Sequence, residues 1–160
     1  MEIKKSSSSS SSKSISFAKI DSTLARDMTE IERKAFLDPW SIVLVKDALS
    51  GANFDNVGLF LDGKLIGYAV LSVVIDEADI TTLAVDPAYH RQGYASLLLE
   101  HMLEHAKKRK IAKLFLEVRV SNTAAIALYK KSGFTLTNIV YKIRYKIIEK
   151  LIILRRIMFL

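Results

Sequence analysis

KLFLEVRVSNTAAIALYKKSGF, residues 113–134, joins a strand pattern to a helix start and carries a charge inside an apolar run. Alternating apolar side chains predict one buried strand face, formed by Leu114, Leu116, Val118 and Val120. The other face carries Phe115, Glu117 and Arg119. A carboxylate in such a strand, just before a helix, predicts that Glu117 faces a ligand cleft and handles a proton.

A helix follows this strand directly. Ser121 and Asn122 are good N-cap residues, and Gly133 stands where a helix-ending glycine belongs. Tyr129 lies seven residues after Asn122, close to two turns, so the two side chains share nearly the same helix face. Because a carboxylate accepts a proton and a phenol donates one, Glu117 and Tyr129 are candidate catalytic residues. A structural ion pair for the carboxylate and a core position for the tyrosine remain the alternatives.

The preceding stretch, LAVDPAYHRQGYASLLLEHML, residues 83–103, places a basic turn between a strand and a long helix. A helix N-terminus offers unpaired N–H groups and a partial positive charge, which suit a pyrophosphate. Gly93 permits close approach of the backbone, and Arg91 adds charge. An ordinary loop and helix start explain the pattern equally well, since it is neither a Walker loop nor a Rossmann fingerprint.

The helix expected over roughly residues 93–109 is amphipathic, with Ala95, Leu98, Met102 and Ala106 at three- and four-residue steps. His101 and His105 lie four residues apart and could form half of a zinc site. No third ligand stands nearby in the sequence and no HExxH motif is present, so solvated histidines are the preferred interpretation and no metal is expected.

Composition limits the class of protein. The chain has 160 residues, half of them hydrophobic, which fits one globular domain. It has no cysteine, which excludes a cysteine nucleophile and a disulfide framework and is compatible with the cytoplasm. The net charge of +7 indicates solubility or an acidic partner such as a phosphate-rich cofactor, RNA or a membrane surface. The basic stretches lack the aromatic spacing of a single-strand platform, so specific nucleic-acid binding is not expected.

The order of elements indicates one α/β or α+β domain over residues 15–160. Residues 1–14, MEIKKSSSSSSSKS, are of low complexity and are expected to form a flexible tail that is not a signal peptide. The expected elements are a strand at 15–20, a helix from Asp21 or Ser22 to about 36, a helix from the DPWS break through 47, a hairpin over 54–75 turning at Asp62-Gly63, and a strand over 79–85. No window supports a membrane span, and the basic, apolar C-terminus is predicted as a final strand rather than a membrane-surface helix.

The two quoted stretches, together and in this order, resemble the GCN5-related N-acetyltransferase (GNAT) superfamily, and within it the ribosomal-protein alanine N-acetyltransferase (RimI-like) group. The segment IERKAFLDPWS also resembles that group's first helix and loop. The similarity covers roughly residues 16–140. His90 departs from the usual glutamine or arginine, Ala95 replaces the last glycine of the loop, and the group's C-terminal pattern is only partly present.

The resemblance implies a single GNAT domain, with a mixed, mostly antiparallel sheet flanked by helices on both faces. It implies that Glu117 is the general base and that Tyr129 is the acid that protonates the departing thiolate. It also implies an acetyl-CoA site, in which strand residues bind pantetheine, a loop binds the pyrophosphate and an asparagine contacts the cosubstrate: Leu83, Ala84, Val85; Arg91, Gln92, Gly93, Tyr94, Ala95, Ser96; and Asn122.

The implied activity is acetyl transfer from acetyl-CoA to a protein N-terminal amino group, by direct attack of the amine on the thioester. The implied acceptor is a protein or peptide N-terminus such as that of a ribosomal protein, with no membrane partner and with nucleic acid met only through the ribosome. Two alternatives stay open. One is an enzyme of the same fold that acetylates a lysine side chain or a small amine, and the other is a non-catalytic module that binds RNA or the ribosome.

Overall fold

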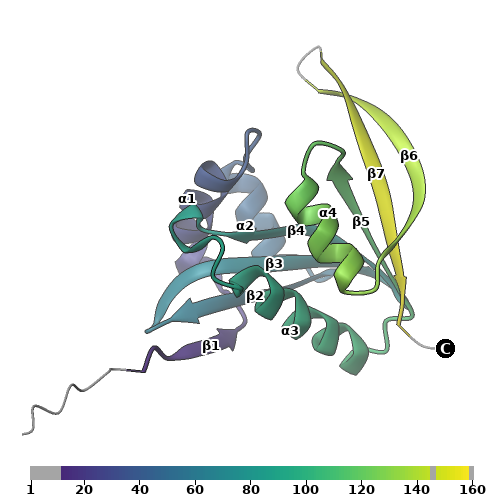
Figure 1. The fold of residues 1–160 in the computed structure, drawn as a ribbon. Coiled ribbons are helices and arrows are strands. Elements are labelled where there is room, and N and C mark those ends of the chain that lie inside the picture. Colours follow the sequence, from purple (N-terminus) through teal and green to yellow (C-terminus); the bar gives the residue numbers. More distant parts are fainter. Residues whose placement is uncertain (1–11, 145–146, 159–160) are drawn as a thin grey trace, which may run out of the picture.

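The structure, a computed structural model, describes residues 12–144 and 147–158. These residues form seven strands and four α-helices (Figure 1). The strands are β1 (Ile15–Ala18), β2 (Phe54–Leu61), β3 (Lys64–Val74), β4 (Glu77–Val85), β5 (Lys113–Arg119), β6 (Thr135–Arg144) and β7 (Ile147–Ile157). The α-helices are α1 (Ala25–Ala35), α2 (Ile42–Ser50), α3 (Tyr94–Lys108) and α4 (Thr123–Lys131), with short 3-10 turns at Ser22–Leu24 and Pro87–Tyr89.

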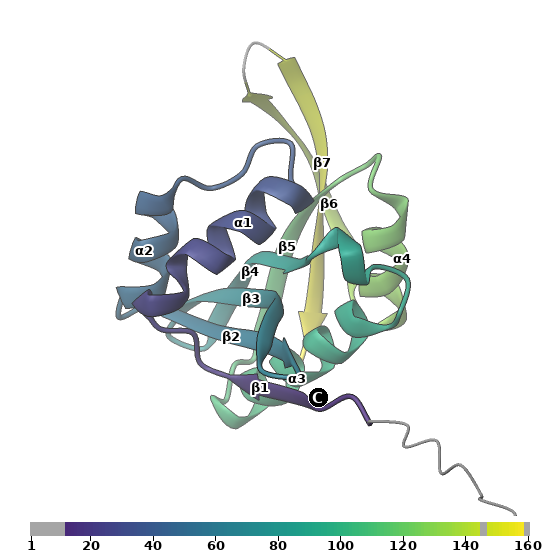
Figure 2. The same cartoon turned by 90° about the vertical axis from the view of Figure 1, so that its left-hand side faces the viewer.

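The strands form one sheet in the order β1-β2-β3-β4-β5-β7-β6. Its pairs are antiparallel except β4 with β5, which run parallel. Helices α1 and α2 cover one face of the sheet, while α3 and α4 cover the other (Figure 2). The predicted mixed, mostly antiparallel sheet with helices on both faces is therefore confirmed.

Local chemistry explains several element ends. Asp62 and Gly63 adopt positive φ angles of 49° and 80°, and they close the β2–β3 hairpin as predicted. The Asp21 carboxylate accepts from the Thr23 backbone N–H at 2.8 Å and so caps the first turn. Ser41 caps α2, which runs to residue 50, beyond the predicted end at residue 47.

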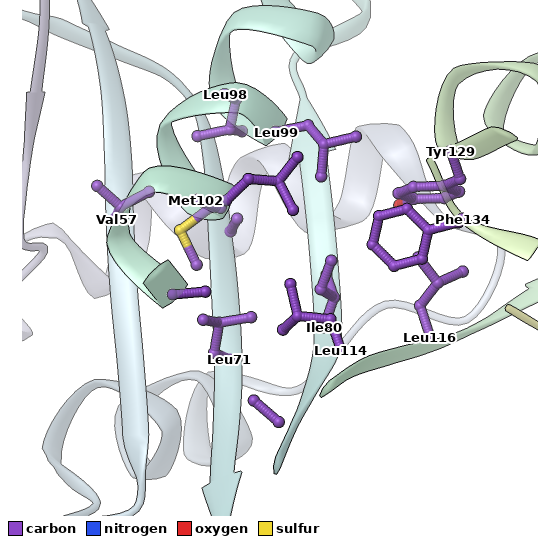
Figure 3. Close-up of a cluster of buried hydrophobic side chains, with 14 of the residues drawn as sticks. Val57, Leu71, Ile80, Leu98, Leu99, Met102, Leu114, Leu116, Tyr129 and Phe134 are labelled. Atoms are coloured by element: carbon purple, nitrogen blue, oxygen red, sulfur yellow. The ribbon is translucent and has the colours of Figure 1, made fainter. Parts of the chain in front are cut away.

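Two apolar clusters fill the space between the helices and the sheet. The larger packs α3 and α4 on β2–β5, with Leu98, Leu99 and Met102 almost fully buried (Figure 3). The smaller packs α1 and α2 on the opposite face around Tyr68 and Val70. The predicted apolar stripe of α3 is confirmed, because Leu98, Met102 and Ala106 are buried. Burying each large side chain contributes about 1.5–3 kcal/mol.

The C-terminal segment forms a strand, as predicted. β7 lies between β5 and β6 and is antiparallel to both. Val120, placed by sequence on the buried face of β5, lies past the end of that strand and is exposed, because the chain turns there toward α4. Across the described residues, no helix combines the length and the apolar character needed to span a membrane.

The chain start is described from residue 12, so most of the predicted tail, residues 1–11, lies outside the described residues. Ser14, the last residue of the predicted tail, is hydrogen-bonded to the β2–β3 turn. Its backbone N–H donates to the Asp62 side chain and its carbonyl accepts from the Asp62 N–H, both at 2.8 Å.

Candidate active site

A cleft opens where β4 and β5 separate. Their parallel register covers three residue pairs and ends at Asp79 with Phe115. On the other edge of β4, the register with β3 skips Thr81, whose hydroxyl donates to the Val70 carbonyl at 3.2 Å. Such a bulge bends a strand and increases its twist. Beyond the last pair, residues 80–83 of β4 and 116–119 of β5 line a cleft of about 740 Å³.

Glu117 lies on the cleft side of β5. Its neighbours Leu116 and Val118, which also line the cleft, are buried, whereas Glu117 itself is exposed. Glu117 thus borders a cleft, and its role in proton transfer stays a prediction. Arg119, two residues further on the same face, lines the cleft as well, so a charged guanidinium belongs to the same surroundings.

Tyr129 reaches the same cleft from α4. The residue is only 8% exposed, and its ring packs edge-on against Phe134 with centroids 5.6 Å apart (Figure 3). Burial raises the pKa of the Tyr129 hydroxyl to about 12. At neutral pH this phenol is therefore protonated and can donate a proton to a group in the cleft.

Asn122 joins the two elements that carry these side chains. Its Oδ1 accepts from the Ala125 backbone N–H at 3.2 Å and caps α4, as the sequence predicted. Asn122 also lines the cleft, and this cap leaves its Nδ2 as a donor. Gly133, at a φ of 88°, ends the helix at the predicted position.

The three β4 residues predicted to bind cosubstrate differ in where their side chains lie. Leu83 lines the cleft, whereas Ala84 and Val85 are buried in the two opposite apolar clusters. Any contact from Ala84 and Val85 with a ligand in the cleft would therefore involve the backbone. The other edge of this segment is paired with β3 through Ala69, Tyr68 and Gly67.

The basic turn leads into α3 as predicted, with Gly93 at a φ of 84° in the N-cap position. A Cβ atom added at Gly93 would meet nothing within 4 Å, so the space around the turn is open. Arg91 and Gln92 are exposed, but the Tyr94 side chain is buried in the core. Any contact of Tyr94 with a ligand at the turn would therefore involve its backbone. The residues of this turn, 91–96, do not line the cleft that Glu117 and Tyr129 share.

The histidine pair has structural partners. The His101 ring stacks on Phe17 with centroids 4.1 Å apart, and His105 lies 3.3 Å from the Asp55 carboxylate. Burial, then the nearby charges of His105 and Lys108, lower the pKa of His101. Both rings are half-buried and have partners within the protein, so the prediction of solvated histidines is only partly correct. Within the ranges 12–144 and 147–158, no group of three or more His, Asp or Glu side chains could hold a metal ion.

Three features lie between residues 25 and 134: the separation of β4 from β5, the glycine turn before α3, and the pair Glu117 and Tyr129. The model of the acetyltransferase (GNAT) family matches residues 25–134. The chain belongs to this family.

Two proteins that are similar to this acetyltransferase have a more specific description than the family. It is 45% identical over 104 residues to the [ribosomal protein bS18]-alanine N-acetyltransferase of Escherichia coli K12, covering 65% of this chain and 70% of that protein. The crystal structure of the ribosomal-protein-S18-alanine N-acetyltransferase from E. coli superimposes with a TM-score of 0.85 at 36% identity, over 92% of this chain and 96% of that one.

A more distant solved structure shows the same fold. The PaiA N-acetyltransferase from Thermoplasma acidophilum, crystallised in complex with coenzyme A, has a TM-score of 0.75 at 19% identity and covers 90% of this chain and 99% of that one.

Two acidic residues of the acetyltransferase cleft were missed by the sequence interpretation. Glu32 is buried on α1, and Asp79 ends the parallel register of β4. Burial, then the charges of Glu117 and Glu77, raise the pKa of Asp79. A signal for Glu32 was present, since it lies seven residues after the buried Ala25 and interrupts the apolar stripe of α1.

Proposed function

We propose that this acetyltransferase transfers acetyl from acetyl-CoA to the α-amino group of protein N-termini, with a ribosomal protein as the first candidate acceptor. The observation that carries the proposal is that Glu117 from β5 and Tyr129 from α4 line one cleft. The names of similar relatives, which act on an alanine of ribosomal protein bS18, support the choice of an α-amine. We expect the reaction to occur in the cytoplasm, and contact with nucleic acid only through the ribosome.

The residues present fit acetyl-CoA at two places. At the start of α3 the open space at Gly93 gives a pyrophosphate access to the N–H groups of Tyr94, Ala95 and Ser96, with Arg91 and Gln92 beside it. Along β4, the backbone of Leu83, Ala84 and Val85 offers hydrogen bonds to the extended pantetheine arm on the edge away from β3. We assign the Asn122 amide as a further contact.

The cosubstrate supplies the acetyl group as a thioester, and the protein supplies the proton transfers. A free α-amine has a pKa near 8, against about 10.4 for lysine, so about a tenth of it is neutral at pH 7. Glu117 accepts the remaining proton from the amine nitrogen, directly or through water. Tyr129, kept protonated by burial, donates to the departing sulfur, and backbone N–H groups of Leu83–Val85 polarise the carbonyl.

A peptide panel with mass spectrometry tests this function. One peptide carries a free N-terminal alanine and acetylated lysines, a second has a blocked N-terminus and free lysines, and a polyamine stands for small amines. We expect acetylation of the first only, with release of one CoA per product. Acetylation of only the lysine peptide or the polyamine would contradict the proposal, as would tight RNA binding without any turnover.

A further inference from the structure

Glu32 is a buried carboxylate in the cleft wall that the proposed proton chemistry does not use. It lies on the inner side of α1 with Met28 and Ile31, and it is 1% exposed. It nevertheless lines the same cleft as Glu117. The four described salt bridges involve other carboxylates, so Glu32 is held by hydrogen bonds from neutral donors.

The two carboxylate oxygens of Glu32 bind different parts of the protein. Oε1 accepts from the Tyr68 hydroxyl on β3 and from the Thr82 hydroxyl on β4, the latter at 3.3 Å. Oε2 accepts from the backbone N–H of Trp40 at 3.0 Å. Glu32 therefore connects the sheet, next to the bulge at Thr81, with the segment 36–41 that joins α1 to α2.

A carboxylate is the side chain that suits this double contact. An unpaired buried carboxylate is costly, and here three donors compensate its desolvation. A glutamine of the same size would have only one accepting oxygen, so it could serve the sheet or the loop but not both. The preceding residue, Pro39, has no N–H that could replace that of Trp40.

The segment that Glu32 anchors is a wall of the cleft. Phe36, Leu37, Asp38 and Trp40 all line it, and Leu37 is 91% exposed at its rim. Trp40 and Thr81 also border a smaller, mainly apolar pocket of about 220 Å³ against α2. None of the residues assigned to acetyl-CoA belongs to segment 36–41, so this wall is available to the acceptor.

We propose that Glu32 is a positioning residue for the acceptor, because its carboxylate fixes segment 36–41 against β3 and β4 and so sets the width of the acceptor side of the cleft. The inference rests on the proposed function for the identity of the acceptor. It does not make Glu32 a catalytic residue, since its oxygens are occupied by protein donors.

The test is Glu32→Gln, with Tyr68→Phe as the matched control. In Glu32→Gln the amide keeps its acceptor for the sheet and loses the one for the Trp40 N–H. We expect the KM for the N-terminal peptide to rise about tenfold or more, the loss expected for one charge-assisted hydrogen bond, with kcat and the KM for acetyl-CoA within twofold of wild type. Tyr68→Phe removes one of the two sheet-side donors and keeps the bonds from Thr82 and from the Trp40 N–H, so it should lower the melting temperature and leave the acceptor KM unchanged.

The chain's one tryptophan, Trp40, gives a readout that needs no substrate. Its emission should shift in Glu32→Gln and not in Tyr68→Phe. Equal rises in acceptor KM for the two variants, or a joint fall of kcat and acetyl-CoA affinity in Glu32→Gln, would show a general structural role and overturn the inference. If Glu32→Gln does not fold, Glu32→Asp, one methylene shorter, takes its place with the same expectations.

Failure of the proposed function would look different. A wild-type protein that acetylates only lysine side chains or small amines would refute the N-terminal acceptor. In that case an unchanged Trp40 emission in Glu32→Gln would also refute the positioning role, whereas a shifted emission, with a raised KM for the amine that is used, would support it.

Discussion

Glu117 is the residue whose removal most directly tests the chemistry. Glu117→Gln keeps the size of the side chain and removes its ability to take a proton. General-base catalysis typically contributes about 10²–10⁴-fold, so kcat should fall by that order. The Kd for acetyl-CoA, measured by calorimetry, should stay within twofold. Glu104→Gln on the exposed side of α3 is the charge-matched control, and unchanged turnover in Glu117→Gln would remove this residue from the mechanism.

The raised pKa of Tyr129 predicts how kcat depends on pH in the alkaline range. Because burial raises the pKa of its hydroxyl to about 12, the acid form persists through the range in which the α-amine loses its proton. The kcat profile of the wild type should therefore not decline on the alkaline side until the pH approaches about 12. Tyr129→Phe should lower kcat across the profile without changing its shape below pH 10. A loss of rate centred near pH 10 in the wild type alone would show that the tyrosine titrates normally.

Asp79 makes a prediction about stability. Burial and the neighbouring charges of Glu117 and Glu77 raise its pKa, so the ionised form is disfavoured in the folded state. Its favourable contribution is complete below the unfolded value near 3.8 and is lost as the pH rises through the higher folded pKa.

Asp79→Asn should therefore melt slightly higher than wild type at pH 7, on the order of 1 °C for a solvent-screened group. This difference should shrink as the pH falls through the raised folded pKa of Asp79, and it should be absent below the unfolded value near 3.8. Thermal melts at several pH values, with Glu104→Gln as the control for net charge, measure it. A lower melting temperature at pH 7 would mean that Asp79 has a favourable partner.

At the scale of elements, phosphate binding at the glycine turn before α3 can be distinguished from the backbone strain that alanine causes at any glycine with a positive φ angle. Gly93 and Gly63 have φ angles of 84° and 80°, and a Cβ at either position meets nothing within 4 Å. Alanine at each should cost about 1–2 kcal/mol of strain and lower the melting temperature by similar amounts. Only Gly93→Ala should raise the Kd for acetyl-CoA, by about tenfold, because its methyl group would occupy the space assigned to the pyrophosphate. Equal cofactor affinity in the two variants would argue against phosphate binding at this turn.

The elements that could be predicted are those whose signals are local. Strand alternation in residues 113–119, the Asn122 cap and Gly133 lie within one stretch, so the orientation of Glu117 and the extent of α4 followed from neighbouring residues. Glu32 depends instead on Tyr68 and Thr82, which lie 36 and 50 residues away along the chain. The fork that opens the cleft has no local signal either, because it results from how far two distant strands remain paired.

At the scale of the whole molecule, the position of β7 could not be read from its own residues. An apolar, basic strand at the end of a chain could have been an edge strand, yet it lies between β5 and β6. β7 pairs with β5 over seven residues, and Ile153 lies opposite Glu117 in this register. The pairing therefore holds the backbone of Glu117 in place. The pairing of β5 therefore depends on a segment that the chain reaches only after α4 and β6.

This arrangement predicts unequal effects of truncation at the two ends. Removing residues 147–160 deletes Leu151, Ile152 and Leu154 from the core, about 5–9 kcal/mol of apolar burial, and exposes one edge of β5. That loss is comparable with the whole stability of a typical domain, so the truncated protein should lose its cooperative thermal transition. Removing residues 2–11 spares Ser14 and its bonds to Asp62, and we propose that it leaves the melting temperature and kcat unchanged. Circular dichroism melts and the peptide assay measure both, and a loss of activity in the N-terminal deletion would show that the serine-rich segment belongs to the functional unit.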